Sequence, residues 1–125
     1  MDRRVINNAL VVRNGRLEEG LSVVIAQGKF LKLVREDGFK PEKADQIIDA
    51  HHCYLTPGFI DLHIHGAGAF LVDHGPDDLA KLCSLLPRYG VTGFLPTISP
   101  RPKGEDERFL RSLAKIKSRG SAILG

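Results

Sequence analysis

Residues 57–66 read PGFIDLHIHG, and they decide how the rest of the chain is interpreted. Successive side chains of an extended strand point to opposite faces, so this stretch has one polar and one aliphatic face. The two faces hold Phe59, Asp61, His63 and His65 on one side and Ile60, Leu62 and Ile64 on the other. Such a strand fits two interpretations, one wet face of an antiparallel sheet or the lining of a metal site. The rest of the chain has to decide between them.

The composition is that of a soluble globular protein. The chain has 125 residues with 42% hydrophobic and 26% charged residues, which excludes a disordered or fibrous class. The net charge of +3 is scattered, and in residues 101–119 bases alternate with acids. The sequence has no basic stripe with interleaved aromatic residues, so we expect no nucleic-acid partner. No apolar run approaches the ~18 residues of a membrane span, so we expect no membrane association.

The cysteines indicate a reducing compartment. Cys53 and Cys83 are the only two, they form no Cys-x-x-Cys pair, and the chain starts without a secretory signal. We therefore expect free thiols and a cytoplasmic location.

Residues 1–55 are predicted to form a small β-domain, a meander of short strands. Asn14-Gly15 between apolar runs is a strong hairpin signal, because both turn positions tolerate positive φ, and Gln27-Gly28 is a weaker one. Two further short strands are expected in residues 46–50 and 53–58.

From Pro57 the pattern changes to alternating strands and helices. Leu79, Leu82, Cys83 and Leu86 have helical spacing, and Pro87 ends that helix. A strand is predicted over 91–97. A second helix is predicted over 105–120, with Phe109, Leu113 and Ile116 inward and Gly120 as its C-cap, and a third strand over 121–125.

This order predicts an α/β fold with parallel strands and helices packed outside. Such a sheet either stays open or closes into an eight-unit barrel, which takes roughly 250 residues. Residues 56–125 supply two and a half βα units, so the expected architecture is the incomplete beginning of a (β/α)8 TIM barrel.

His63 and His65 are the candidate metal ligands. Their Cβ atoms are expected about 6.6 Å apart on one side, from the ~3.3 Å rise per residue. Both rings can then converge on one ion at the ~2.0–2.1 Å distances that zinc prefers. They end the first strand of a βα series, and catalysis in α/β barrels sits at that end.

The blocks IIDAHHCYLTPGFIDLHIHG and RYGVTGFLPTIS, after the small β-domain, resemble the amidohydrolase superfamily over essentially the whole chain. Within it they look most like the N-acetylglucosamine-6-phosphate deacetylase family. The resemblance implies a β-sandwich, built from both ends of the chain, beside a metal-dependent barrel. It implies that His63 and His65 bind a divalent ion, zinc first, with iron, manganese or cobalt as alternatives. For Asp61 it implies a supporting hydrogen bond rather than ligation.

The implied reaction removes acetate from N-acetylglucosamine 6-phosphate in amino-sugar catabolism, and the implied assembly of the whole enzyme is a homodimer. No catalytic or substrate-binding residue is assigned within the 125 residues, because the family's carboxylates and remaining ligands follow later. We therefore expect this chain by itself to lack activity. Two alternatives stay open: a cyclic-amide hydrolase related to dihydroorotase or hydantoinase, and a non-catalytic remnant.

The remaining polar residues receive a structural interpretation. His51 and His52 are expected at the surface with side chains pointing apart on an extended chain, and His74 in a solvated loop. Gly66 and Gly68 fit a phosphate-binding nest, but a sharp turn explains them equally well. Thr92 and Thr97 are expected to be ordinary strand residues.

Overall fold

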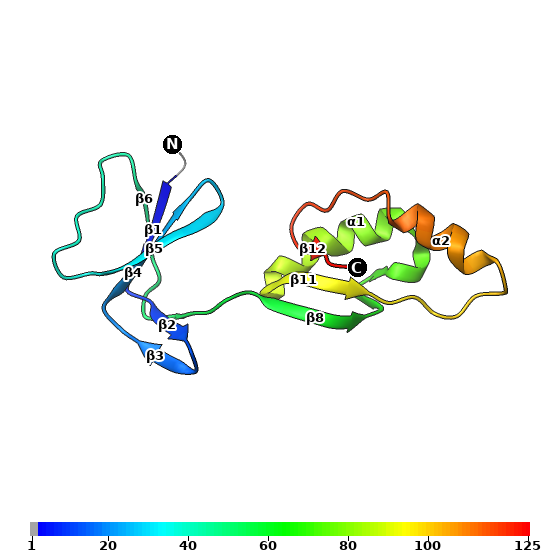
Figure 1. Cartoon of the computed structure of the whole chain (residues 1–125), viewed down its shortest axis with the longest axis horizontal. Helices are drawn as coiled ribbons and strands as arrows, with labels where there is room; N and C mark the ends of the chain where they lie inside the picture. The colour runs from blue at the N-terminus through cyan, green and yellow to red at the C-terminus, as the bar shows by residue number, and fades with distance from the viewer. Residues whose placement is uncertain (1–2) are drawn as a thin grey trace. The chain divides into compact units, whose positions relative to one another are not determined.

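The computed structural model describes residues 3–125, and the chain forms two compact units. The first unit ends at Pro57 and the second runs from Gly58 to Gly125 (Figure 1). Each unit has its own hydrophobic core. Strands and helices are mixed, which confirms the α/β class. Within residues 3–125 no helix has the length and apolar character needed to cross a membrane.

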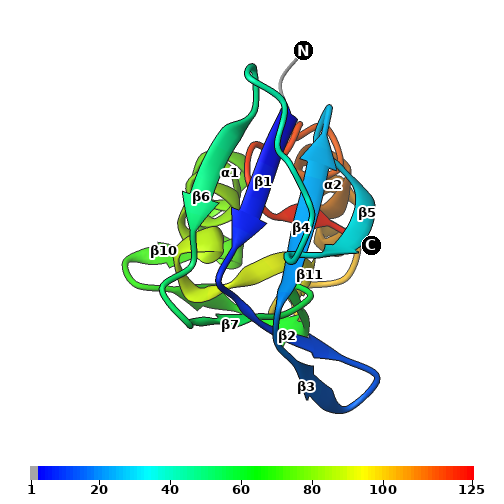
Figure 2. The same cartoon turned by 90° about the vertical axis from the view of Figure 1, so that its left-hand side faces the viewer.

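The first unit consists of strands in two sheets (Figure 2). The four-stranded sheet has the order β5 (Lys29–Arg35), β4 (Leu21–Ala26), β1 (Arg3–Asn7), β6 (Gln46–Asp49). The three-stranded sheet has the order β3 (Arg16–Glu18), β2 (Leu10–Arg13), β7 (Tyr54–Leu55).

Both predicted hairpins are confirmed. Asn14 and Gly15 have φ of 52° and 71° between the antiparallel strands β2 and β3, and Gln27 and Gly28 have φ of 53° and 70° between β4 and β5. Two consecutive positive φ angles give the turn whose twist matches that of the flanking strands.

The predicted simple meander is wrong, because β6 pairs with β1 and β7 pairs with β2, both in parallel. Parallel partners need a long connection, and the residues between β1 and β6 provide it. The extended backbone expected at His51 and His52 is also wrong. Both have positive φ, 47° and 59°, in a tight turn that brings β7 alongside β2.

The second unit contains a parallel sheet of order β12 (Ala122–Ile123), β11 (Val91–Pro96), β8 (Phe59–Ile64). Between β8 and β11 lie a two-stranded hairpin and helical segments. These are β9 (Gly66–Ala67), β10 (Phe70–Leu71), η1 (Val72–His74), α1 (Pro76–Leu85) and η2 (Leu86–Tyr89). Helix α2 (Glu105–Leu113) connects β11 to β12.

Helix α1 begins and ends where its sequence dictates. Pro76 occupies the first turn, where its missing N–H costs nothing, and Asp77 and Asp78 add negative charge at the positive end of the helix dipole. Regular α-helix ends at Leu85, and Pro87 lies in the 3₁₀ turn that follows, as predicted.

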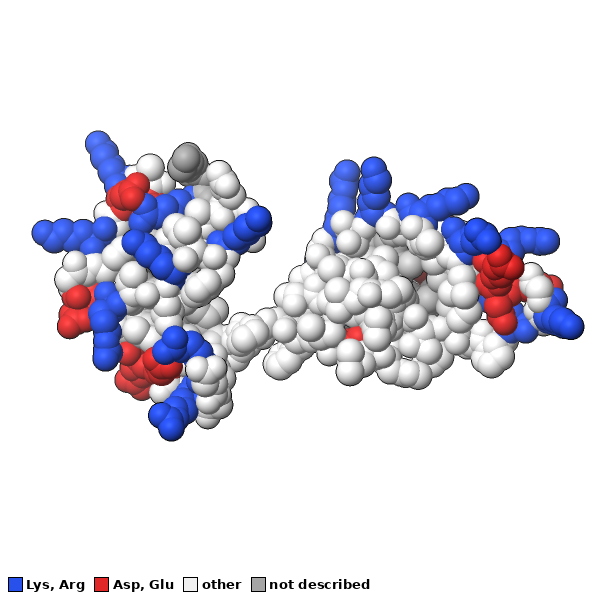
Figure 3. Space-filling view, in the orientation of Figure 1, with Lys and Arg blue, Asp and Glu red and all other residues white. Residues whose placement is uncertain are grey.

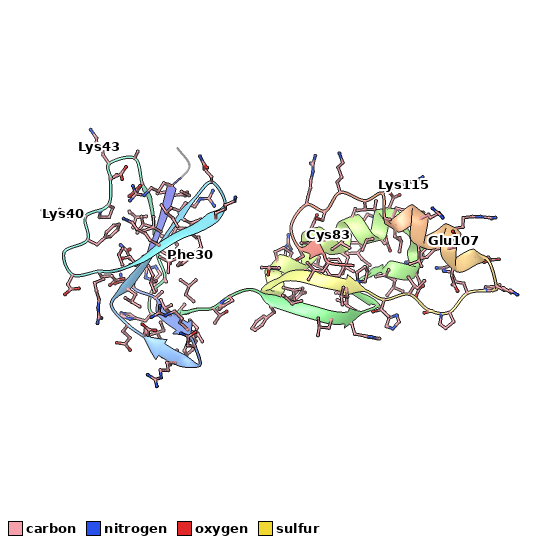
Figure 4. The ribbon with its side chains drawn as sticks, in the orientation of Figure 1. Phe30, Lys40, Lys43, Cys83, Glu107 and Lys115 are labelled. Atoms are coloured by element: carbon pink, nitrogen blue, oxygen red, sulfur yellow. The ribbon has the colours of Figure 1, made fainter. Side chains whose placement is uncertain are left out.

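The core of the second unit forms between α1 and the sheet. The four residues predicted to face inward are buried, three of them in α1 and Leu86 at the start of η2, and Cys83 is marked in Figure 4. Phe94 of β11, the central strand, is fully buried among them. The core residues are Val72, Leu79, Leu82, Cys83, Leu86, Phe94 and Leu113.

Helix α2 is shorter than predicted. Phe109, Leu113 and Ile116 pack on the core as expected, but regular helix ends at Leu113 and Gly120 does not cap it. The N–H of Ile116 donates to the Leu113 carbonyl at 3.0 Å, which turns the chain back toward β12. The segment between α2 and β12 is rich in exposed bases, visible as a blue row in Figure 3.

Strand β8 buries less of its aliphatic face than predicted. The strand's alternation predicts that Ile60, Leu62 and Ile64 pack under the helix at residues 77–86. Ile64 packs on the core, but Ile60 and Leu62 are 59% and 70% exposed, so the prediction is wrong for these two residues. The physical reason is that β8 is an edge strand of this three-stranded sheet, while the core forms over β11.

Candidate metal centre

The candidate site lies at the carboxyl end of β8. Because β8 and β11 are parallel, their carboxyl ends meet at one edge of the sheet. The Thr97 N–H donates to the Ile64 carbonyl at 2.8 Å and holds the two ends together. His63 lies within β8 and His65 directly follows it.

The two imidazoles lie on the same side of the strand. Their ring centroids are 5.0 Å apart, with an angle of 72° between the ring planes, and both residues are exposed. The alternation of the sequence predicts this placement, and opposite faces would have excluded a shared ion.

This arrangement fits two ligands of one divalent ion. With metal–nitrogen distances of about 2.0–2.1 Å in tetrahedral directions, two ring centroids come to lie roughly 5 Å apart. The observed separation agrees with that value. In the described part of the chain, no group of three or more His, Cys, Asp or Glu side chains is placed to hold an ion together.

Asp61 supports the backbone beside the histidines. Its Oδ1 accepts a hydrogen bond from the His63 N–H at 3.0 Å, and the residue is half-buried. On an edge strand this bond satisfies a backbone donor that has no strand partner on that side.

The turn after His65 is tightly closed. The His65 carbonyl accepts from the Val72 N–H at 2.8 Å, so the β9–β10 hairpin begins and ends beside the histidine. Gly68, with φ of 59°, lies in the hairpin turn. Gly66 has no room for a side chain, since a Cβ there would lie 2.3 Å from the Phe70 carbonyl oxygen. Both glycines are therefore explained by the turn.

We expect Gly66→Ala to displace β10 and disturb His65. The clash is with backbone, which cannot rotate away, and overpacking of this kind costs about 1–3 kcal/mol. A lower melting temperature and a shifted His65 imidazole NMR signal are the expected results. Gly68→Ala is the matched control, because its Cβ would meet only the Leu85 side chain, at 3.5 Å, and the strain stays in the turn. An unmoved His65 signal in Gly66→Ala would contradict the expectation.

The other three histidines come from other segments of the chain. His51 and His52 are exposed in the first unit, as expected, and the His51 N–H donates to Asp49 Oδ1 at 2.8 Å. His74 Nδ1 lies 2.9 Å from Asp78 Oδ2 at the start of α1. This contact with the imidazole, first among several, lowers the pKa of the Asp78 carboxyl.

The two threonines differ in position. Thr92 lies near the amino end of β11, where its Oγ1 is 3.5 Å from the Phe59 carbonyl oxygen. Thr97 follows β11 at the carboxyl end, and its Oγ1 donates to the Leu95 carbonyl at 3.4 Å. Only Thr97 is at the same end of the sheet as the histidines.

Comparison with known proteins gives relatives of both enzyme types that the sequence analysis considered, a deacetylase and a dihydroorotase. The chain is 39% identical over 67 residues, 53% of its length, to N-acetylgalactosamine-6-phosphate deacetylase of Escherichia coli O157:H7. It is 32% identical over 118 residues, 90% of its length, to dihydroorotase of Staphylococcus aureus strain Mu50. These matches cover 18% and 26% of the two relatives, so the chain spans about a quarter or less of their length. No protein-family model matches.

Comparison with solved structures also gives an amino-sugar-phosphate deacetylase. The crystal structure of N-acetylglucosamine-6-phosphate deacetylase from Pasteurella multocida matches 95% of this chain and 32% of its own, with a TM-score of 0.77 and 20% identity. The resemblance to the amidohydrolase superfamily is confirmed. At this identity the structural likeness to the Pasteurella multocida enzyme concerns the fold, and the site residues rest on the geometry above.

Proposed function

We propose that the protein is a metal-dependent hydrolase of amidohydrolase type, acting in the cytoplasm. Its substrate is N-acetylglucosamine 6-phosphate, which it converts with water to glucosamine 6-phosphate and acetate in amino-sugar catabolism. The observation that carries this proposal is the same-side pair of His63 and His65 at the carboxyl end of β8. The similarity to an amino-sugar-phosphate deacetylase supports the choice of substrate.

In this proposal, residues of this chain coordinate the ion. A divalent ion, zinc first, with iron, manganese or cobalt as alternatives, would polarise the amide carbonyl and lower the pKa of water. His63 and His65 would each give one ring nitrogen. Asp61 fixes the His63 backbone by its hydrogen bond, which is the supporting role proposed for it. The carboxylate that moves the proton to the leaving amine is not assigned to any residue here.

The architecture proposed for the whole protein follows the same resemblance. Residues 56–125 form the first two and a half units of a (β/α)8 barrel, and residues 1–55 form part of a composite β-sandwich in a homodimer. An apolar hollow in the first unit supports the sandwich, because further strands would cover it. Its lining includes Ile6, Val23, Phe30, Leu33 and Leu55. Phe30 is 67% exposed there (Figure 4).

A cyclic-amide hydrolase is the second candidate. The similarity to dihydroorotase extends over 90% of the chain, further than the similarity to the deacetylase. Both reactions cleave an amide C–N bond, so the imidazole pair does not distinguish them.

Substrate assays separate the candidates. They need the zinc-loaded whole protein proposed above, because the 125-residue chain by itself is expected to lack activity. We expect acetate release from N-acetylglucosamine 6-phosphate, and at least about 100-fold less from unphosphorylated N-acetylglucosamine. The reason is that a site built to bind a charged group leaves its polar groups unpaired when the substrate lacks that group. Faster turnover of N-acetylgalactosamine 6-phosphate would change the proposed sugar substrate but leave the proposed deacetylase reaction in place. Ring opening of dihydroorotate without acetate release would refute it, and no turnover of any of these would favour a non-catalytic remnant.

A further inference from the structure

Asp73, in the η1 turn, connects two segments that the sequence keeps apart. Its carboxylate accepts the Ser99 N–H at 3.0 Å and 3.2 Å and the Ser99 hydroxyl at 2.8 Å. It also accepts from Arg101 Nη2 at 3.3 Å. These bonds lower the pKa of the Asp73 carboxyl, the Ser99 hydroxyl first, so the group is ionised at neutral pH. Ser99 and Arg101 belong to the loop after β11.

Arg101 is itself held in place on three sides. Its guanidinium carbon lies 3.6 Å from the centroid of the Phe109 ring of α2, a stacked cation–π contact. Its backbone N–H donates to Asp106 Oδ1 at 3.1 Å, and its Nη2 donates to the Asp73 carbonyl at 3.0 Å. Arg101 therefore anchors the loop after β11 both to α2 and to Asp73.

The other end of this connection is the candidate metal ligand. Val72, next to Asp73, is fully buried, and its N–H donates to the His65 carbonyl. Strands β9 and β10, which lead from His65 to η1, have only two residues each and hold little by themselves. The segment after His65 thus depends on contacts at η1 for its fixed position.

We propose that Asp73 is a positioning residue for His65. Its carboxylate fastens η1 to the loop after β11, and the Val72 N–H passes this restraint to the His65 backbone. The inference rests on the proposed function for its link to metal binding. Partners that support a metal ligand typically matter about 10–100-fold for affinity.

Two measurements on the 125-residue chain test this positioning. The first is amide hydrogen exchange of Val72 relative to Phe94 without metal, and the second is a zinc titration followed on the His65 imidazole signals. In Asp73→Ala we expect Val72 to exchange about 10-fold faster with Phe94 changed less, because only local opening becomes easier. Zinc affinity should fall about 10-fold. Asp73→Asn, which keeps an acceptor for Ser99, should lie between wild type and Asp73→Ala.

Asp49→Ala is the matched control. The Asp49 carboxylate also accepts two hydrogen bonds and has a lowered pKa, because of His51 first, but it lies in the first unit. We expect no change at Val72 or His65 in this variant.

The outcomes separate cleanly. Unchanged Val72 exchange in Asp73→Ala, or equal acceleration at Val72 and Phe94, would overturn the proposal, since a merely structural carboxylate gives those results. Faster exchange at Val72 alone in Asp73→Ala, combined with no zinc binding by His63 and His65 in the wild-type chain, would refute the proposed function and still support the positioning of His65.

Discussion

Replacing both His63 and His65 by alanine is expected to abolish specific zinc binding by the chain. The two rings lie 5.0 Å apart on one side of β8, a separation at which each could supply a ligand to the same ion. Changing groups that only support a ligand costs about 10–100-fold in affinity, so loss of both ligands is expected to cost at least about 100-fold. Isothermal titration with zinc at neutral pH measures the effect directly.

The chain offers a matched control for this experiment. His51→Ala with His52→Ala removes two exposed imidazoles that are also close in sequence, but from a turn in the first unit. We expect it to leave zinc affinity within about 2-fold of wild type, because stray surface histidines hold an ion weakly. Equal losses in the two double variants would show that the binding is non-specific and would remove the basis of the metal centre.

Phe94→Ala is expected to cost the second unit about 3–5 kcal/mol of unfolding free energy. Phe94 is fully buried on the central strand β11, in contact with the core that α1 builds. Whole domains have only about 5–15 kcal/mol in total, so this variant should leave the second unit unfolded or barely folded. Urea denaturation followed by NMR signals of the second unit gives the value separately from the first unit.

Phe59→Ala provides the comparison within the same sheet. Phe59 lies on the edge strand β8 and is 63% exposed, so its truncation should cost about 0.5 kcal/mol or less. If Phe94→Ala were as mild as Phe59→Ala, the core assigned to the second unit would be wrong.

Features with a local cause were predictable from the sequence. The placement of His63 and His65 follows from strand alternation alone, and the buried face of α1 follows from its helical spacing. The hairpin at Asn14 and Gly15 needs only two residues that tolerate positive φ.

Features that depend on partners distant in the sequence were not predictable. Ile60 and Leu62 have the pattern of buried residues, but their exposure is set by the place of β8 at the sheet edge. The early end of α2 at Leu113 depends on where Ile116 must pack, which no local signal shows.

The same limit applies to the site. Asp73 carries no motif, and its partner Ser99 lies 26 residues further on, so only the folded chain brings them together. A carboxylate that precedes a helix is ordinarily interpreted as a helix-terminal charge, which hides its contact with the next loop.

The two thiols of the chain differ in accessibility, and this makes the buried one a reporter of opening and the exposed one its internal reference. Burial raises the pKa of the Cys83 thiol inside the second core, whereas Cys53 is exposed in the first unit. The thiolate is the nucleophile that attacks an alkylating reagent, so the reagent modifies exposed Cys53 at once and Cys83 only when α1 lifts from the sheet. The rate of Cys83 alkylation therefore reports the opening of α1, the helix that packs on the core around the central strand β11, without any label being introduced.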